Sequence, residues 1–260
     1  MYIGFREIDE TIDINRPQLT VLGSRPGMGK SSFALNIISN IFLNQEESVL
    51  YFNLESSKEL IRKRTIALNL LRDPKDINSG FGYGIFKDDM KNDYDISKVS
   101  KNDKLIVDTT PNISIEEIYR KSLKMKIEED IKLIVIDYLQ LIRYEKDDIS
   151  KRNEQLQEIL RILKVTSKEL DVPIIVLSQL SSEVDKRQNH KPMMFDFSDC
   201  KMGVYNYVDN VLMLYRDDYY NEYSERRNIA EILIVKNKLG KLKSIDLVWI
   251  PSYFRFSDFL

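Results

Sequence analysis

Two hydrophobic patterns alternate along most of the chain. Short runs rich in Val, Ile and Leu predict strands that are buried on both faces, and longer stretches with apolar residues three or four positions apart predict amphipathic helices. Because strands that alternate with helices are typical of parallel sheets, the pattern predicts an α/β fold. The predicted strands are Leu19–Gly23, Val49–Leu54, Leu105–Asp108, Leu133–Asp137 and Ile174–Gln179. The predicted helices are Lys30–Leu43, Ser57–Leu71, Ser114–Ile127 and Asn153–Leu170.

The last third of the chain has a different pattern. Three further runs, Val211–Tyr215, Ile229–Lys236 and Ile245–Ile250, are joined by connections short enough for antiparallel pairing at one edge of the sheet. The stretch 73–103 is rich in Asp, Lys, Asn and Gly and predicts an irregular or short-helical excursion. We expect residues 1–260 to form one domain, because α/β folds of this length commonly do.

Composition narrows the class of protein. A hydrophobic content of 43% with only 9 glycines and 7 prolines excludes disordered and collagen-like chains. The net charge of -2 gives no overall basic field, so any contact with nucleic acid must be local. A single cysteine and a single histidine exclude an internal disulfide, a multi-cysteine zinc site and a histidine cluster. With no signal-peptide or membrane-span pattern, we expect a cytoplasmic protein.

A glycine-containing loop lies between the first predicted strand and the first predicted helix. In this context glycines let backbone N–H groups approach phosphate oxygens, the lysine reaches the β- and γ-phosphates, and the serine hydroxyl binds Mg²⁺. The generic phosphate-loop pattern has Gly where Ser24 stands, and an ordinary strand-to-helix turn is the alternative. The residues expected to bind nucleotide are Ser24, Arg25, Pro26, Gly27, Met28, Gly29, Lys30, Ser31 and Ser32.

Polar residues end three of the other predicted strands. Asp137 follows an apolar run and supplies the carboxylate that Mg²⁺ needs beside the Ser31 hydroxyl. Glu55 could polarise the water that attacks the γ-phosphate, and the Gln179 amide could sense that phosphate. Taken alone, Asp137 and Glu55 could equally cap the helices that follow them.

Short motifs follow one another in a fixed order. They read Arg-Pro-Gly-Met-Gly-Lys-Ser at 25–31, Asn-Leu-Glu at 53–55, Ile-Asp-Tyr-Leu-Gln-Leu at 136–141, Ser-Gln-Leu at 178–180 and Tyr-Arg-Asp-Asp-Tyr-Tyr at 215–220. The series closely resembles the C-terminal motor domain of the DnaB family of replicative helicases, over nearly the whole chain. The resemblance implies a RecA-like P-loop NTPase core, with a mostly parallel twisted sheet, helices on both faces and antiparallel strands at the C-terminal edge.

The resemblance also implies how such a domain works. It implies a ring, usually hexameric, with ATP and Mg²⁺ between neighbouring subunits, single-stranded DNA in the central channel, and replication partners such as a primase or a loader. Glu55 takes the place of the catalytic base of the family, and Arg64 and Arg216 take those of arginines near the nucleotide. A solvated helix charge is the alternative for Arg64. Lys236 and Lys238 match the pair that one subunit supplies to the ATP of the next.

Two departures from the family bear on activity. The N-terminal helical domain and linker helix are missing, so the chain is either a cut piece or a single-domain relative, and ring formation is in question. The trans-acting pair of the family is Lys-x-Arg, whereas Lys238 stands here in place of the arginine finger. Because lysine lacks the planar fork that grips several phosphate oxygens, we expect slow hydrolysis. The alternative for Lys236 and Lys238 is a protected edge strand.

The loop that holds DNA in the family also differs here. Ser198 stands where arginine is expected, and Tyr205 and Tyr207 replace acidic residues. We expect backbone N–H groups and a lysine to hold phosphates, and we expect the two tyrosines to pack on one face of an extended segment, with base stacking as the alternative. The candidate DNA-binding residues are Ser198, Asp199, Lys201 and Gly203.

Three functional hypotheses remain open from the sequence. The first is a Mg²⁺-dependent ATPase motor of the DnaB type, in which Lys30, Glu55 and Gln179 are catalytic. The second is a non-motor nucleotide-binding adaptor or accessory protein with weak or no hydrolysis, which the altered finger and DNA loop favour. The third is a recombination or clock-type ATPase that shares the fold.

Overall fold

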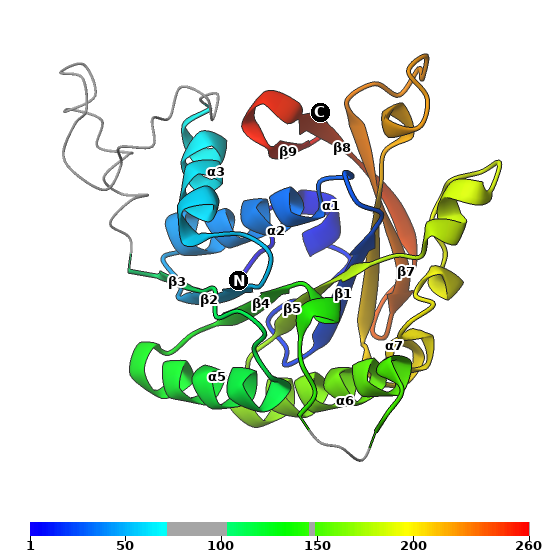
Figure 1. The fold of residues 1–260 in the computed structure, drawn as a ribbon. Helices are drawn as coiled ribbons and strands as arrows, with labels where there is room; N and C mark the ends of the chain where they lie inside the picture. The colour runs from blue at the N-terminus through cyan, green and yellow to red at the C-terminus, as the bar shows by residue number, and fades with distance from the viewer. Residues whose placement is uncertain (72–102, 146–148, 260) are drawn as a thin grey trace.

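A single mixed sheet organises the computed structural model, which describes residues 1–71, 103–145 and 149–259 (Figure 1). The strands lie in the order β3-β2-β4-β5-β1-β6-β7-β8-β9. Pairing is parallel from β3 to β6 and antiparallel from β6 to β9, which confirms the predicted α/β class and the antiparallel C-terminal edge. The strands are β1 (Leu19–Ser24), β2 (Val49–Asn53), β3 (Leu105–Asp108), β4 (Leu133–Asp137), β5 (Ile174–Gln179), β6 (Asn210–Tyr215), β7 (Ile229–Asn237), β8 (Lys243–Ile250) and β9 (Arg255–Asp258).

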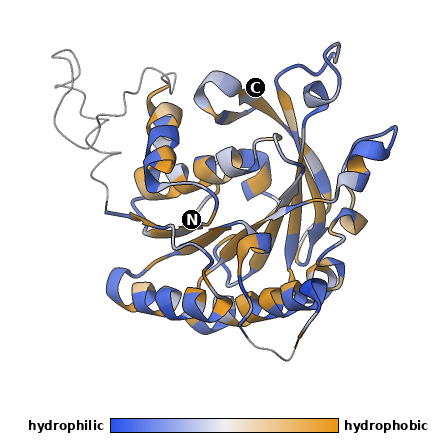
Figure 2. Cartoon of the chain, viewed as in Figure 1, coloured by the Kyte–Doolittle hydropathy of each residue, from blue (hydrophilic) through white to orange (hydrophobic). Residues whose placement is uncertain are grey.

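Helices cover both faces of the sheet, as the resemblance implies (Figure 1). One apolar cluster joins the sheet to the helices α1 and α2, and a second joins its other face to α5, α6 and α7. Figure 2 shows hydrophobic residues concentrated on the sheet and on the helix sides that meet it. The α-helices are α1 (Arg6–Asp9), α2 (Lys30–Ser39), α3 (Lys58–Leu70), α5 (Ile115–Glu129), α6 (Arg152–Leu170) and α7 (Lys201–Tyr207).

The ends of the predicted helices follow local capping. Ser57 Oγ accepts a hydrogen bond from the N–H of Leu60, and Ser114 Oγ accepts one from the N–H of Glu117, so each serine caps the helix that begins after it. The helix predicted from Lys30 to Leu43 continues as α2 only to Ser39 and ends in a wider π-type turn, Asn40–Asn44. The predicted excursion at 73–103 lies almost wholly outside the described residues.

The prediction of an extended segment around the two tyrosines was wrong. Residues 201–207 form α7, which packs against α6, and the helical turn places Tyr205 and Tyr207 in different surroundings. Tyr207 is half-buried against the apolar cluster of α6, whereas Tyr205 is exposed. The packing expectation therefore fits Tyr207 alone. The short strand β9 was not predicted from the sequence.

The parallel strands place their ends together. β1, β2, β4 and β5 all point the same way, so the residues that follow them meet at one edge of the sheet, where ligands of open α/β sheets bind. That edge carries the loop after β1, Glu55 after β2, Asp137 at the end of β4 and Gln179 at the end of β5. Among the helices that the structure describes, none is long and apolar enough to span a bilayer.

Candidate nucleotide-binding site

The glycine-containing loop connects β1 to α2. Gly27 and Gly29 have φ angles of +80° and +100°, in the left-handed region that residues with a Cβ avoid. Gly29 immediately precedes the first turn of α2. The free backbone N–H groups of that turn therefore point out of the helix end, beside the loop. The Met28 side chain points the other way and is buried in the core. Tyr219 lies over Gly27, where a Cβ would come within 2.7 Å of its ring.

A pocket of about 420 Å³ opens beside this loop. It brings together residues from the loop, from the ends of β2 and β5, and from α3. The predicted site residues that line it are Arg25, Pro26, Gly27, Gly29, Lys30, Ser31, Ser32, Glu55, Arg64 and Gln179. Four further lining residues were missed by the sequence analysis, namely Ser56, Tyr138, Trp249 and Phe254. Ser24 is buried at the end of β1.

The Lys30 ammonium lies among the acidic residues of the pocket. Its Nζ atom is 4.8 Å from the centre of the Tyr138 ring. Burial lowers the pKa of Lys30, and the nearby Asp137 and Glu55 carboxylates oppose that shift. The cation is therefore influenced by two nearby carboxylates and is partly removed from water.

Asp137 is held by two polar residues of the neighbouring strand. Tyr51 Oη donates to Asp137 Oδ2 at 3.1 Å, and Asn53 Nδ2 donates to Tyr51 Oη at 2.6 Å. Asn53 Oδ1 also accepts the N–H of Ser56 at 2.6 Å, so one side chain fixes the turn that carries Glu55. The sequence signal for Tyr51 was a hydroxyl two residues before Asn53, on the same face of an otherwise apolar strand.

Three buried polar atoms of this region have no hydrogen-bond partner within the described residues: Asp137 Oδ1, Arg64 Nε and Trp249 Nε1. Buried polar groups are normally paired, so each of these atoms is available to bind a ligand. An unpaired carboxylate oxygen suits Mg²⁺, which prefers oxygen ligands, and two N–H donors suit a nucleotide. The residues present therefore fit MgATP.

Two arginines stack on aromatic rings at the pocket. The Arg64 guanidinium lies 5.6 Å from the Phe254 ring centre, and that of Arg216 lies 5.3 Å from the Trp249 ring centre. Arg216 also forms an ion pair with Asp218 at 3.2 Å. Arg64 thus lies in the pocket and is more than a solvated helix charge, whereas Arg216 reaches the pocket only through Trp249.

Arg25 has a different set of partners from the rest of the loop. Its guanidinium donates to Asp185 Oδ2 at 2.6 Å and to the Leu180 carbonyl at 2.8 Å. Tyr220 Oη donates to the other Asp185 oxygen at 2.6 Å. Arg25 therefore links the phosphate loop to the segment that follows Gln179.

A model of the family described as the DnaB-like helicase C terminal domain matches residues 1–258. The chain belongs to this family. The replicative DNA helicase DnaB of Geobacillus stearothermophilus is 35% identical over 254 residues, which are 97% of this chain and 55% of that protein. The chain thus spans about half the length of the curated relatives it matches.

Solved structures agree with this membership. One solved structure, of an ATPase domain, is 30% identical with a TM-score of 0.87, over 99% of this chain and 90% of that one. A DnaB-like replicative helicase, solved for its interactions with primase, is 30% identical with a TM-score of 0.88, over 99% of this chain and 63% of that one. The RecA-like core predicted from the motifs is confirmed, and the DnaB-like family takes precedence over the recombination and clock-type alternatives.

In this DnaB-like domain, Lys236 and Lys238 lie far from the phosphate loop. The N–H of Lys238 donates to the Asp209 carbonyl, and the N–H of Asp209 donates to the Leu19 carbonyl, at the start of β1. The phosphate loop follows the other end of β1, a strand of six residues that spans about 17 Å at roughly 3.3 Å per residue. Neither lysine can therefore reach the nucleotide pocket of its own chain.

Both lysines have partners in their own chain. Lys236 Nζ donates to the carbonyl oxygens of Val204 at 3.1 Å and Tyr205 at 2.7 Å, at the C-terminal end of α7. Burial lowers the pKa of Lys236, while the Asp209 carboxylate opposes this. Lys238 is exposed and lies 3.5 Å from Asp209 Oδ1.

The candidate DNA-binding residues separate into two groups. Ser198, Asp199 and Lys201 are exposed at the start of α7. Gly203 is buried, and a Cβ there would come within 2.9 Å of the Gln157 Cα on α6. The glycine thus permits close packing of α7 on α6 and is not accessible to DNA.

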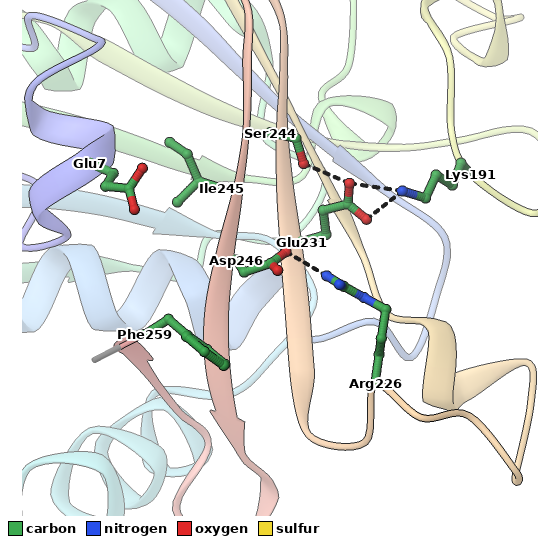
Figure 3. Close-up of a pocket in the computed structure, with 8 residues that line it drawn as sticks. All are labelled: Glu7, Lys191, Arg226, Glu231, Ser244, Ile245, Asp246 and Phe259. Atoms are coloured by element: carbon green, nitrogen blue, oxygen red, sulfur yellow. Dashed lines mark hydrogen bonds and ion pairs between the residues drawn. The ribbon is translucent and has the colours of Figure 1, made fainter.

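A second pocket, of about 500 Å³, lies on β7 and β8 (Figure 3). Four of its charged groups form two pairs, since Lys191 Nζ lies 2.7 Å from Glu231 Oε2 and Arg226 bonds to Asp246, while Glu7 pairs with Lys243. Ser244 Oγ also donates to Glu231 at 2.6 Å. Because these charged groups already have partners, this pocket has fewer free polar groups for a ligand than the nucleotide pocket has.

Cys200 provides a simple test of the packing around α7. It is 1% exposed, and burial raises the pKa of its thiol to about 12. Because only the thiolate reacts, we expect a thiol reagent at about pH 8 to label the folded chain far more slowly than the chain in denaturant. The release of the coloured leaving group measures both rates. Equal rates would show that Cys200 is accessible.

Proposed function

We propose that this domain binds MgATP and hydrolyses it to move along single-stranded DNA, as the motor of a replicative DnaB-type helicase. One observation carries the proposal: Lys30, Glu55 and Gln179 line a single pocket at the ends of β1, β2 and β5, and the buried Asp137, with one unpaired oxygen, ends the neighbouring strand β4. The family membership of the chain supplies the reaction class, since the relatives it matches are replicative DNA helicases.

The residues of the pocket divide the chemistry among them. The backbone of the loop and the Lys30 ammonium bind the β- and γ-phosphates, and Ser31 and Asp137 hold Mg²⁺. Mg²⁺, when bound, neutralises charge on the phosphate oxygens. Glu55 accepts the proton of the attacking water, and the Gln179 amide contacts the γ-phosphate. Gln179 leads directly into the segment that carries the DNA-side residues.

The nucleobase has a place between the arginine and aromatic side chains at the mouth of the pocket. Trp249 and Phe254 offer apolar faces, and Trp249 Nε1 offers a buried hydrogen-bond donor. Arg64 lies across the Phe254 ring and lines the same pocket, where its guanidinium would bind phosphate oxygens. These side chains come from α3 and from the C-terminal edge of the sheet.

A second copy of the chain completes the site in this proposal. Since Lys236 and Lys238 lie at the opposite edge of the sheet, they serve the nucleotide of a neighbour in a ring, as the family resemblance implies. The exposed Lys238 is free to leave Asp209 for this role, while Lys236 must share its donors between α7 and the neighbour.

Single-stranded DNA binds on the channel side of the ring, at Ser198, Asp199 and Lys201. The exposed Tyr205 offers a face on which a base can stack, which is worth about 1 to 3 kcal/mol per base. One structural neighbour was solved for its interactions with primase. We extend that to this chain as a proposal of contact with a primase or a helicase loader.

A non-motor nucleotide-binding accessory protein is the second candidate function. The observation that favours it is Lys238 in place of the arginine finger, since lysine binds phosphate as a point charge without the bidentate fork. In that case the pocket would bind MgATP tightly and turn it over slowly or not at all.

Steady-state ATP hydrolysis, with Mg²⁺ and with or without single-stranded DNA, separates these candidates. We expect slow hydrolysis that DNA accelerates and that Lys30→Ala abolishes, because the ammonium binds the transferred phosphate. Lys63→Ala, which removes an ammonium from the surface of α3, is the matched control. Tight MgATP binding with no hydrolysis under either condition would favour the accessory protein, and equal rates for Lys30→Ala would show contamination.

A further inference from the structure

We propose that Gln140 is a positioning residue for Gln179, and that it joins the metal-binding end of β4 to the phosphate-sensing end of β5 as one rigid unit. The inference rests on the proposed function for its consequence, since Gln179 matters only if a γ-phosphate lies beside it. The structural part of the inference can be tested without any activity.

The sheet has a gap in its pairing beside Gln179. β1 pairs with β5 as far as Ser24 and Gln179, and the N–H of Leu180 donates to the Ser24 carbonyl at 3.0 Å. On the other side, the pairing of β4 with β5 ends at Ile136 and Val176. Because alternate peptides of a strand face opposite neighbours, the N–H and C=O of Gln179 point to the side where β4 has ended.

The Gln140 side chain fills this gap. Its Oε1 accepts the N–H of Gln179 at 3.2 Å, and its Nε2 donates to the Gln179 carbonyl at 3.0 Å and to Ser178 Oγ at 3.1 Å. A primary amide presents one acceptor and two donors, and all three are used. Gln140 thus imitates a strand partner at the point where the sheet has lost one.

The main chain of Gln140 is fixed in turn. Gln140 lies in a short 3₁₀ turn, Leu139–Leu141, three residues after Asp137. Arg152, at the start of α6, donates to the carbonyls of Gln140 at 3.0 Å and Ile142 at 2.7 Å. The turn is therefore held at both ends, by β4 and by α6. A movement of Gln179 must carry this turn with it.

The consequence is a defined position for the Gln179 side chain. Gln140 holds both backbone groups of Gln179 and Ser24 holds the N–H of the next residue, Leu180, so the Gln179 side chain projects into the pocket from a fixed peptide. A sensor amide must lie within about 3 Å of a phosphate oxygen to donate a hydrogen bond. Loss of Gln140 frees the peptide and spreads the amide over several positions.

The chain contains a matched control for this arrangement. Gln45 makes the same two-sided contact with another peptide: its Oε1 accepts the N–H of Tyr2 at 2.9 Å, and its Nε2 donates to the Tyr2 carbonyl at 2.8 Å. Neither Gln45 nor Tyr2 lines the nucleotide pocket. Gln45→Ala therefore removes the same kind of contact away from the chemistry.

The first measurement is amide hydrogen exchange in the chain without nucleotide. We expect Gln140→Ala to raise the exchange rate of the Gln179 N–H by about tenfold or more, because its acceptor is lost. Gln45→Ala should leave Gln179 unchanged. Gln140→Glu, which keeps an acceptor oxygen but loses both donors, tests the same contact if the alanine variant unfolds, and it should protect the N–H better than alanine does. Unchanged exchange in Gln140→Ala would overturn the proposal.

The second measurement is a double-mutant cycle on ATP hydrolysis. We expect Gln140→Ala to lower kcat with little change in KM for ATP, and the double variant Gln140→Ala with Gln179→Ala to be no slower than Gln179→Ala alone. Additive effects would show that Gln140 does not act through Gln179. If the wild-type chain hydrolyses nothing, the proposed function fails, while the exchange experiment still decides the position of Gln179.

Discussion

Replacing Glu55 with Gln is expected to slow ATP hydrolysis by about 10² to 10⁴-fold while MgATP still binds, because a general base contributes a factor of that size. Glu55 follows β2 and lines the pocket, and Asn53 fixes the turn that carries it. An amide has nearly the same shape as the carboxylate but cannot accept a proton. Single-turnover hydrolysis measures the chemical step, and titration with a fluorescent nucleotide measures binding.

Glu59→Gln is the matched control for this experiment. Glu59 lies in the first turn of α3, where it pairs with Lys63 at 3.2 Å, and it is not among the residues that line the nucleotide pocket. We expect its hydrolysis rate to equal that of the wild type. Normal hydrolysis in Glu55→Gln would remove Glu55 from the catalytic role, whereas loss of binding in the same variant would show a role in shaping the pocket.

Lys238→Arg is expected to accelerate hydrolysis by at least about tenfold and to make the rate rise with protein concentration. An arginine finger can be worth roughly 10³ or more in rate, because its planar guanidinium bonds several phosphate oxygens at once. Lys238 is exposed and only loosely paired with Asp209, so arginine fits without repacking. Steady-state rates over a range of chain concentrations test both parts.

Lys241→Arg controls for a general effect of added guanidinium on the same hairpin. Lys241 is exposed between β7 and β8. We expect no acceleration from it. If Lys238→Arg leaves the rate unchanged at every concentration, then either the copies do not associate or the finger does not reach the neighbouring nucleotide. Sedimentation of the same samples with MgATP distinguishes these two explanations.

Much of the fold could be predicted from the sequence because its central strands are buried on both faces. Runs such as that of β4 are apolar up to the last residue, so their position and parallel pairing follow from pattern alone. α7 could not be predicted in this way, because it has only seven residues and its shape depends on the packing of Gly203 against α6. β9 is shorter still, at four residues, and depends on pairing with β8.

The candidate site, like the fold, could be predicted from the sequence only in part. Lys30, Asp137 and Glu55 could be named because each stands at a fixed offset from a strand or a glycine; the structure places Lys30 and Glu55 in one pocket, with Asp137 near Lys30. Trp249 and Phe254 lie far along the chain and reach the pocket only through the antiparallel edge of the sheet. The contact of Gln140 with Gln179 depends on where β4 stops pairing with β5, a register that no local pattern reveals.

The phosphate loop follows the end of β1, whereas Lys238 lies near its start. This separation has a genetic consequence. Under the proposed assembly, each copy contributes to two nucleotide sites, its own through Lys30 and that of a neighbour through Lys238. A copy that has lost Lys30 or Lys238 would therefore impair a nucleotide site to which an intact copy also contributes. Alleles that keep the fold but lose one of these lysines would be dominant over the wild type, whereas alleles that destroy the core would be recessive.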